Sequence, residues 1–181
     1  MNVLTLDDLR YTYKDYARWK GDWELIEGVP IAMTPAPSIE HQSLAGEIAF
    51  QLRRQLENCP QCRVLGEVDY KIDEETLVRP DVLVACQPVS GPYLTHAPEL
   101  IVEVVSPSTA RRDEKVKFQL YAREKVRYYI LAYPHDLRAR VYRLKNGRYD
   151  KVGESLDDAP RFDGLPCPLI LDFGQVFRIL D

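Results

Sequence analysis

The 181-residue sequence has no run approaching the ~18 apolar residues of a membrane-spanning helix, nor the basic-then-apolar start of a signal peptide. It also has no internal repeat and no low-complexity tract, which excludes fibrous and repeat architectures. Its 45% hydrophobic and 29% charged residues exclude intrinsic disorder. We therefore expect one globular domain, cytoplasmic, with no membrane partner.

Cysteine is scarce: the chain has four, at positions 59, 62, 86 and 167. This is too few for a disulfide scaffold at this length, so reduced thiols are expected. Cys59 and Cys62 have the spacing of zinc and thioredoxin motifs, but a four-thiolate zinc site needs a second pair, and Cys86 and Cys167 are isolated in the sequence. The sequence therefore does not favour a zinc or redox role, and it also lacks a glycine-rich phosphate loop.

Positive charge is concentrated in one segment of an acidic chain. The net charge is -4, but residues 111–148 carry 12 Lys and Arg against 4 Asp and Glu. Such a segment can attract a polyanion, or it can simply be a solvated surface. Charge alone does not decide between these readings.

The first third of the chain predicts two helices around a hairpin. Thr5 and the acids after it indicate a helix at about 6–19. Glu27-Gly28 is a hairpin turn signal between two apolar segments. Apolar residues at helical spacing then predict an amphipathic helix over 38–57.

The rest of the chain predicts a mixed α/β arrangement. Three strands are expected within 63–73, 76–86 and 98–106, followed by a helix that begins near Ser108 or Thr109. A strand over 126–134 and a hairpin turning at Asn146-Gly147 complete the pattern. The order predicts a strand–helix–strand crossover at the centre of the domain.

Two carboxylates interrupt otherwise apolar strands. Asp81 follows Pro80 in VRPDVLVA, and Glu103 lies within LIVEVVS. Each could be an outward-facing acid, but a buried carboxylate needs a cationic partner or a metal ion. Because two such acids lie on successive strands, they favour a site for Mg²⁺ or Mn²⁺, which prefer hard oxygen ligands.

The helix after Glu103 carries a lysine on its apolar face. At about 100° per residue, Lys117 lies with Leu120 and Tyr121, whereas Lys115 points to the opposite side. An inward lysine needs a carboxylate or a phosphate, unless it only pairs with Asp113 or extends to solvent. We expect Lys117 to point toward the sheet and Lys115 toward solvent.

His41 lies on the apolar side of the helix at 38–57, and Glu47 does not. A histidine in that position is most often a core residue, but it could also hold a phosphate or a metal-bound water. The same geometry argues against Glu47 as an additional metal ligand.

Several of these segments resemble one known family. RPDVLVA, ELIVEVVSPST, DEKVKFQLYAREKVRYYI and WELIEGVPIAMTPAPSIEHQ resemble the Uma-two family of putative restriction endonucleases, in the PD-(D/E)XK nuclease superfamily. The resemblance covers about residues 5–153. Its most specific part is EVVSPST followed by Asp113, Lys117 and Tyr121 at intervals of four residues.

The resemblance implies an α/β fold with a restriction-endonuclease-like core, a mixed central sheet flanked by helices. We expect a single domain, 1–181, with an additional N-terminal helix and hairpin in 1–37, a nuclease core in 38–134, and a C-terminal hairpin and tail in 135–181.

The resemblance also implies a catalytic site. Asp81 and Glu103 would ligate Mg²⁺ or Mn²⁺, and Lys117 would be the catalytic lysine, with His41, Asp113 and Tyr121 in accessory positions. The sequence departs from the superfamily pattern at Val105, where the usual motif has lysine, and at Ala132-Tyr133, where many relatives have an acid.

Together these patterns predict a metal-dependent endonuclease that hydrolyses phosphodiester bonds, with DNA as the expected substrate. A homodimer would suit cleavage of both strands of a duplex. The alternative is a non-catalytic nucleic-acid-binding or protein-interaction module that retains the nuclease fold. Metal-dependent cleavage distinguishes the two.

Overall fold

The computed structural model of the chain describes residues 9–33, 37–155 and 159–180. Its centre is a six-stranded sheet with the strand order β10-β9-β8-β7-β6-β3. The strands are β3 (Arg63–Gly66), β6 (Val82–Ala85), β7 (Leu100–Val104), β8 (Tyr128–Tyr133), β9 (Arg138–Lys145) and β10 (Arg148–Ser155). Neighbouring strands are antiparallel except β7 and β8, which are parallel and joined by the predicted helical crossover.

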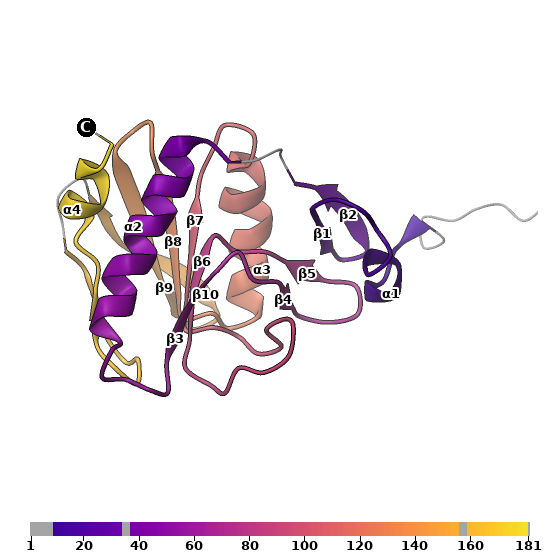
Figure 1. Cartoon of the computed structure of the whole chain (residues 1–181), viewed down its shortest axis with the longest axis horizontal. Helices are drawn as coiled ribbons and strands as arrows, with labels where there is room; N and C mark the ends of the chain where they lie inside the picture. Colours follow the sequence, from indigo (N-terminus) through magenta and orange to yellow (C-terminus); the bar gives the residue numbers. More distant parts are fainter. Residues whose placement is uncertain (1–8, 34–36, 156–158, 181) are drawn as a thin grey trace, which may run out of the picture.

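Helices cover both faces of this sheet (Figure 1). On one face lie α2 (Ile39–Gln55) and the short α4 (Phe173–Arg178), and on the other lies the crossover helix, which ends in α3 (Phe118–Arg123). Successive strand residues alternate between the two cores: Val102 packs on the α2 side, and Ile101 on the α3 side. The mixed sheet flanked by helices confirms the predicted fold class.

A second sheet lies beside the central one, toward the N-terminal part of the chain (Figure 1). Its order is β2-β1-β5-β4. It contains β1 (Trp23–Ile26), β2 (Val29–Ala32), β4 (Tyr70–Lys71) and β5 (Leu77–Val78), and α1 (Tyr13–Tyr16) precedes it. The β1–β2 turn is at Glu27-Gly28, as predicted, and both residues have positive φ, 50° and 78°. A small third sheet pairs β11 (Arg161–Phe162) with β12 (Leu169–Ile170).

The N-terminal helix is much shorter than the sequence predicts. It spans Tyr13–Tyr16, and its N-cap is Thr12, whose backbone N–H and hydroxyl both donate to Asp15 Oδ2 at 3.0 Å. The expected cap, Thr5, lies outside the described residues. The helix at 38–57 is close to prediction, with Ser38 as its N-cap.

Two of the three strands predicted at the centre of the chain are each split in two, and the first of them, 63–73, forms β3 and β4. The segment 76–86 forms β5 and β6, with a break at Arg79-Pro80-Asp81, where Pro80 has no N–H to donate to a neighbouring strand. Because β5 belongs to the second sheet and β6 to the central sheet, the break places Asp81 at the junction between the sheets.

The crossover helix is partly a π-helix, over Arg112–Lys117, before it continues as α3. The step of 100° per residue used for the face prediction does not hold in a π-helix, which has i→i+5 hydrogen bonds. Asp113 and Lys117 nevertheless both point inward, because four residues are close to one turn in either type of helix.

The expectation about the cysteines is wrong. Cys59 is bonded to Cys167, and Cys62 to Cys86, so residues that are far apart in the sequence meet in space. Among the described residues, no helix is both long and apolar enough to cross a membrane.

Candidate active site

Asp81 and Glu103 lie opposite each other on paired strands. The antiparallel register of β6 and β7 ends with Val82 opposite Val102, and continuing it by one residue beyond β6 brings Asp81 opposite Glu103. Residues in directly opposite positions have Cβ atoms about 4.5–5.5 Å apart. Asp81 Oδ2 accepts a hydrogen bond from the Val104 N–H at 2.7 Å, and both carboxylates line one cleft of about 170 Å³.

Lys117 reaches this cleft from the crossover helix. Its Nζ lies 2.9 Å from Oε1 of Glu103, 2.7 Å from Oε1 of Glu24 and 3.9 Å from Oδ1 of Asp113. The side chain is buried, whereas Lys115 is exposed. The structure thus places both lysines where the helical pattern predicts them.

Glu103 is held from two sides. Besides Lys117, the hydroxyl of Tyr121 donates to Glu103 Oε1 at 2.9 Å. Burial raises the pKa of Glu103 well above its usual value, against the opposing effect of the Lys117 charge. Burial also acts to lower the pKa of Lys117, but the charges of Glu103, Glu24 and Asp113 outweigh it and raise that pKa, so Lys117 remains an ammonium at neutral pH.

Glu24, on β1, is a site residue that the sequence analysis missed. It is fully buried, and its Oε1 accepts a hydrogen bond from the Arg79 N–H at 2.9 Å in addition to the contact with Lys117. Its Oε2 lies 3.4 Å from Nε of Arg112. The signal was present in the sequence, because Glu24 interrupts an apolar strand just as Glu103 does.

Asp113 and Arg112 complete the buried part of the cluster. Asp113 Oδ1 lies 3.7 Å from Nε of Arg112 and makes no hydrogen bond within the described part of the chain. Burial raises the pKa of Asp113, while the charge of Lys117 opposes that shift. Asp113 also helps to fix the helix on the sheet, because its backbone carbonyl accepts a hydrogen bond from the Tyr129 hydroxyl at 3.0 Å.

His41 approaches Asp81 from the start of α2. Its Nε2 lies 3.4 Å from Asp81 Oδ2, and its backbone N–H donates to Ser38 Oγ at 3.2 Å. Burial acts to lower the pKa of His41, but its hydrogen bond to Asp81 and the negative charge there raise that pKa above its usual value. Glu47 instead accepts from Gln51, at 3.0 Å, and does not line the cleft.

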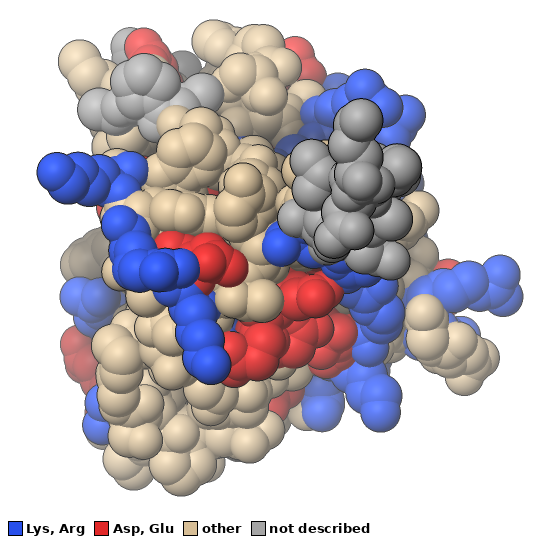
Figure 2. Space-filling view, turned by 90° about the vertical axis from the view of Figure 1, so that its right-hand side faces the viewer, with Lys and Arg blue, Asp and Glu red and all other residues tan. Residues whose placement is uncertain are grey.

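The cluster has an excess of negative charge. Four carboxylates, those of Glu24, Asp81, Glu103 and Asp113, accompany two cations, Arg112 and Lys117, which leaves a formal charge of -2 when His41 is neutral. On the surface, Figure 2 shows other Asp and Glu side chains gathered in the middle of the face on the side of the N-terminal hairpin, with Lys and Arg side chains around them, whereas Glu24, Glu103 and Asp113 are buried. A charge of -2 matches that of one divalent cation.

The donor atoms also suit such an ion. Asp81 and Glu103 each use one oxygen for their contacts, and neither Oδ1 of Asp81 nor Oε2 of Glu103 has a hydrogen-bond partner in the described part of the chain. Hard carboxylate oxygens are the ligands that Mg²⁺ and Mn²⁺ prefer. No three of these carboxylates come within 4.8 Å of one another across the described ranges, so water or backbone oxygens would complete the coordination shell.

The two departures from the superfamily motif have different surroundings. Val105 is buried in the core on the α3 side, and Lys117 supplies the ammonium beside Glu103 from the helix instead. Ala132 is buried on the opposite, α2 side of the sheet, and the hydroxyl of Tyr133 donates to Glu114 at 2.8 Å. Neither departure removes the lysine beside Glu103, because Lys117 supplies it.

The basic segment 111–148 does not form one uniform surface. Lys117 is buried in the cleft and Arg112 is mostly buried there, while Arg123 pairs with Glu27 and Arg140 with Glu154. Exposed basic residues of the segment that form no ion pair with another described residue are Arg111, Lys115, Lys125, Arg143, Lys145 and Arg148. Much of the positive charge is therefore used within the molecule.

Comparison with solved structures shows a shared fold. The crystal structure of a putative nuclease of the DUF820 group from Anabaena variabilis ATCC 29413 superposes with a TM-score of 0.76 at 18% identity, over 94% of this chain and 99% of that one. A DrdV–DNA complex gives a TM-score of only 0.32 at 14% identity, over 77% of this chain and 14% of that one, too weak to indicate a shared fold. No curated protein matches the sequence.

The family follows from the sequence itself. The family model described as "Uma2: Putative restriction endonuclease" matches residues 12–173. The chain belongs to the Uma2 family, as its motifs predicted.

Proposed function

We propose that the chain is a metal-dependent endonuclease that hydrolyses phosphodiester bonds in DNA. The observation that carries the proposal is the pairing of Asp81 with Glu103 on adjacent strands, beside the buried ammonium of Lys117, in a cleft with an excess of two negative charges. Membership of the Uma2 family supports the same reaction class.

In this proposal Asp81 and Glu103 hold one Mg²⁺ or Mn²⁺ through their open carboxylate oxygens. The ion would supply Lewis-acid stabilisation of the phosphate charge when bound. Without a cation, a cleft of net negative charge would repel a polyanionic substrate, so the acidic excess itself favours metal dependence.

Lys117 acts as a hydrogen-bond donor rather than as a base, because it is held as an ammonium. Two of its three protons are directed to Glu103 and Glu24, which leaves one for a phosphate oxygen or the attacking water. Glu24, Glu103 and Tyr121 therefore fix the position of this donor before substrate arrives.

His41 and Asp113 hold other side chains of the cleft in position. His41 contacts the metal-binding carboxylate of Asp81, and Asp113 lies between Lys117 and Arg112. The exposed basic side chain of Arg111, at the start of the crossover helix, can contact the nucleic-acid backbone with little dependence on sequence.

Incubation of the purified chain with plasmid, single-stranded DNA and RNA, each with Mg²⁺, Mn²⁺ or EDTA, tests the proposal. We expect cleavage of DNA that requires the divalent ion and is lost in Asp81→Asn, while Lys115→Ala retains it. Binding without cleavage in every metal would instead support the non-catalytic module. Preferential cleavage of RNA would preserve the reaction class and change the substrate.

A further inference from the structure

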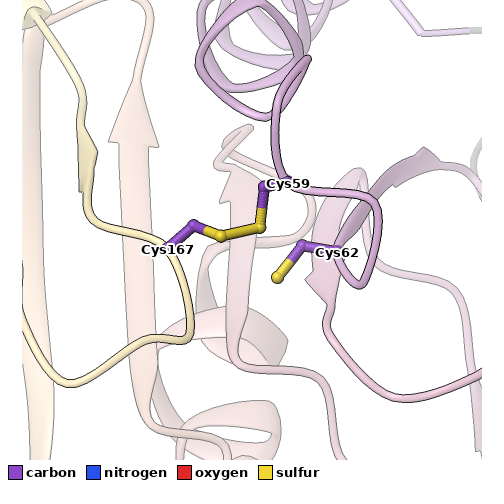
Figure 3. A group of neighbouring side chains, drawn as sticks. All are labelled: Cys59, Cys62 and Cys167. Atoms are coloured by element: carbon purple, nitrogen blue, oxygen red, sulfur yellow. A yellow bond between two sulfur atoms is a disulfide. The ribbon is translucent and has the colours of Figure 1, made fainter.

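The four cysteines gather at a second site, away from the cleft. Sγ atoms of Cys59, Cys62 and Cys167 lie within 4.8 Å of one another, as Figure 3 shows for these three side chains. Cys62 is in turn bonded to Cys86. The two pairs are thus not separate cross-links in different parts of the molecule. One group of sulfur atoms lies at one end of the core on the α2 side.

We propose that, after a thiol reductant has converted the two disulfides of this structure to four thiols, these thiols bind one structural Zn²⁺ ion. Tetrahedral zinc with four thiolates has Zn–S distances of ~2.3 Å, which separates the sulfur atoms by about 3.8 Å. The spacing of the three neighbouring sulfurs, under 4.8 Å, is compatible with this geometry after small side-chain movements. Reduction of the two disulfides takes four electrons and four protons from the thiol reductant, and zinc binding then releases the four protons without a further redox change.

The local sequence and backbone support zinc. Cys59 and Cys62 have the two-residue spacing of structural zinc motifs, and the Cys62 N–H donates to the Cys59 carbonyl at 3.0 Å, which closes a tight turn. These two cysteines are bonded to distant partners and not to each other, and the Sγ atoms of both lie within 4.8 Å of that of Cys167. Cys86 and Cys167 supply the second pair that the sequence alone could not provide.

The surroundings are those of a closed structural site. Cys59 and Cys62 are buried, and Cys86 and Cys167 are half-buried beside the same core. The side-chain amide of Gln61 donates to Sγ of Cys167 at 3.7 Å. Hydrogen bonds of this kind orient metal ligands and stabilise thiolate charge.

The backbone at Cys62 and Cys86 fits a disulfide less well than the backbone at Cys59 and Cys167. The Cα atoms of Cys59 and Cys167 are 6.4 Å apart, and those of Cys62 and Cys86 are 3.9 Å apart. The usual range for a disulfide is about 4.4–6.8 Å, so the second pair lies outside it. A shared zinc ion does not require either pair of sulfurs to come into bonding contact.

A zinc ion here would stabilise β6 and α2 at the ends opposite to those that lie at the cleft. Cys86 directly follows β6, whose other end adjoins Asp81, and Cys59 lies just beyond the end of α2, whose first turn carries His41. Cys167 lies between β11 and β12, so the site also ties the C-terminal segment to this framework.

The test is to purify the full chain in a non-thiol reductant without chelator and measure metals by mass spectrometry. We expect close to one zinc per chain. Replacement by Co²⁺ should give the intense visible bands of tetrahedral cobalt together with sulfur-to-cobalt charge-transfer absorption. Asp81→Asn, which alters only the cleft, should retain the zinc, whereas Cys86→Ser and Cys167→Ser should each lower its content at least several-fold.

The wild-type protein decides the outcome even if a cysteine variant does not fold. A metal-free chain whose intact mass under non-reducing, denaturing conditions is lower by four hydrogen atoms than after reduction would show two disulfides and overturn the proposal. So would four free thiols without zinc, or zinc well below one per chain with no sulfur-to-cobalt absorption. Because the readouts are metal content and spectra, they are independent of nuclease activity.

Discussion

The shortest ion pair of Lys117, 2.7 Å, is with Glu24 on the N-terminal hairpin, while its pair with Glu103 on the central sheet is 2.9 Å. One buried ammonium therefore joins three parts of the chain: the hairpin, the crossover helix and the sheet. The hairpin, which the sequence suggested as an addition to the core, contributes directly to the candidate site.

Glu24→Ala should destabilise the protein strongly. It leaves Lys117 with one carboxylate fewer in a buried position and removes the acceptor of the Arg79 N–H. Removing one partner of a buried ion pair costs about 3–5 kcal/mol of unfolding free energy. Glu24→Gln keeps the shape and one oxygen acceptor and should cost clearly less. Urea unfolding in EDTA measures the unfolding free energy of both variants. Equal and small losses of unfolding free energy in Glu24→Ala and Glu24→Gln would contradict a stabilising ion pair between Glu24 and Lys117.

Lys117→Ala should reduce DNA cleavage by at least about 100-fold, in keeping with the loss of one positioned donor in an active site. Lys115→Ala, on the exposed side of the same helix, is the matched control and should change cleavage less than about threefold. Circular dichroism and urea unfolding measure the stability that each variant retains, because Lys117→Ala leaves the buried Glu24 and Glu103 without their shared cation. Comparable cleavage by the two variants would remove Lys117 from the mechanism.

Asp81→Asn should abolish the stabilisation of the protein by Mg²⁺. An ion that binds only the folded state adds about 2.7 kcal/mol at a concentration 100 times its Kd. In EDTA the variant should unfold within about 1 kcal/mol of the wild type, because Asn can still accept from the Val104 N–H and one repelling charge is removed.

Thermal melts with and without millimolar Mg²⁺ or Mn²⁺ measure this difference. Glu47→Gln, an acid on α2 that does not line the cleft, is the control and should keep the metal-dependent shift. If neither ion changes the Tm of the wild type, and Asp81→Asn is much less stable than the wild type in EDTA, Asp81 is a structural acid and not a metal ligand.

Glu154, on β10, should contribute to stability in a pH-dependent way. Hydrogen bonds from Lys151 and Arg140 lower the pKa of Glu154 from 4.5 to about 2. Because the folded-state pKa is the lower one, the contribution is fully present above pH 4.5 and is lost as the pH falls toward 2.

The comparison of wild type with Glu154→Gln by urea unfolding at pH 6 and pH 2 checks this sign. The wild type should be the more stable protein at pH 6, and most of the difference should be lost at pH 2. High salt should reduce the difference at pH 6, because the groups are solvent-accessible. A difference that grows toward low pH would be inconsistent with the ion pairs.

The sequence predicted the elements that carry strong local signals. Asn146-Gly147 and Glu27-Gly28 both mark hairpin turns in the structure, with positive φ at all four residues, because few residue types adopt that conformation easily. The placement of Asp81, Glu103 and Lys117 in one cleft also followed from strand order and helical spacing.

What the sequence did not reveal depends on distant contacts. Glu24 meets Lys117 only because β1 pairs with β5 in a second sheet, and no local pattern shows that pairing. Cys167 meets Cys59 across a separation of 108 residues, which spacing rules cannot anticipate. The catalytic roles of the cleft residues are still predictions that the variants above test.

The π-helix at Arg112–Lys117 has a consequence for insertions and deletions. Its i→i+5 hydrogen bonds accommodate one residue more per turn than an α-helix has room for. Deleting the exposed Val116 would allow this segment to become α-helical, with three residues from Asp113 to Lys117 in place of four. Because residues three or four apart share one face of a helix, the acid and the lysine should stay on one side, so this turn can lose one residue without separating them.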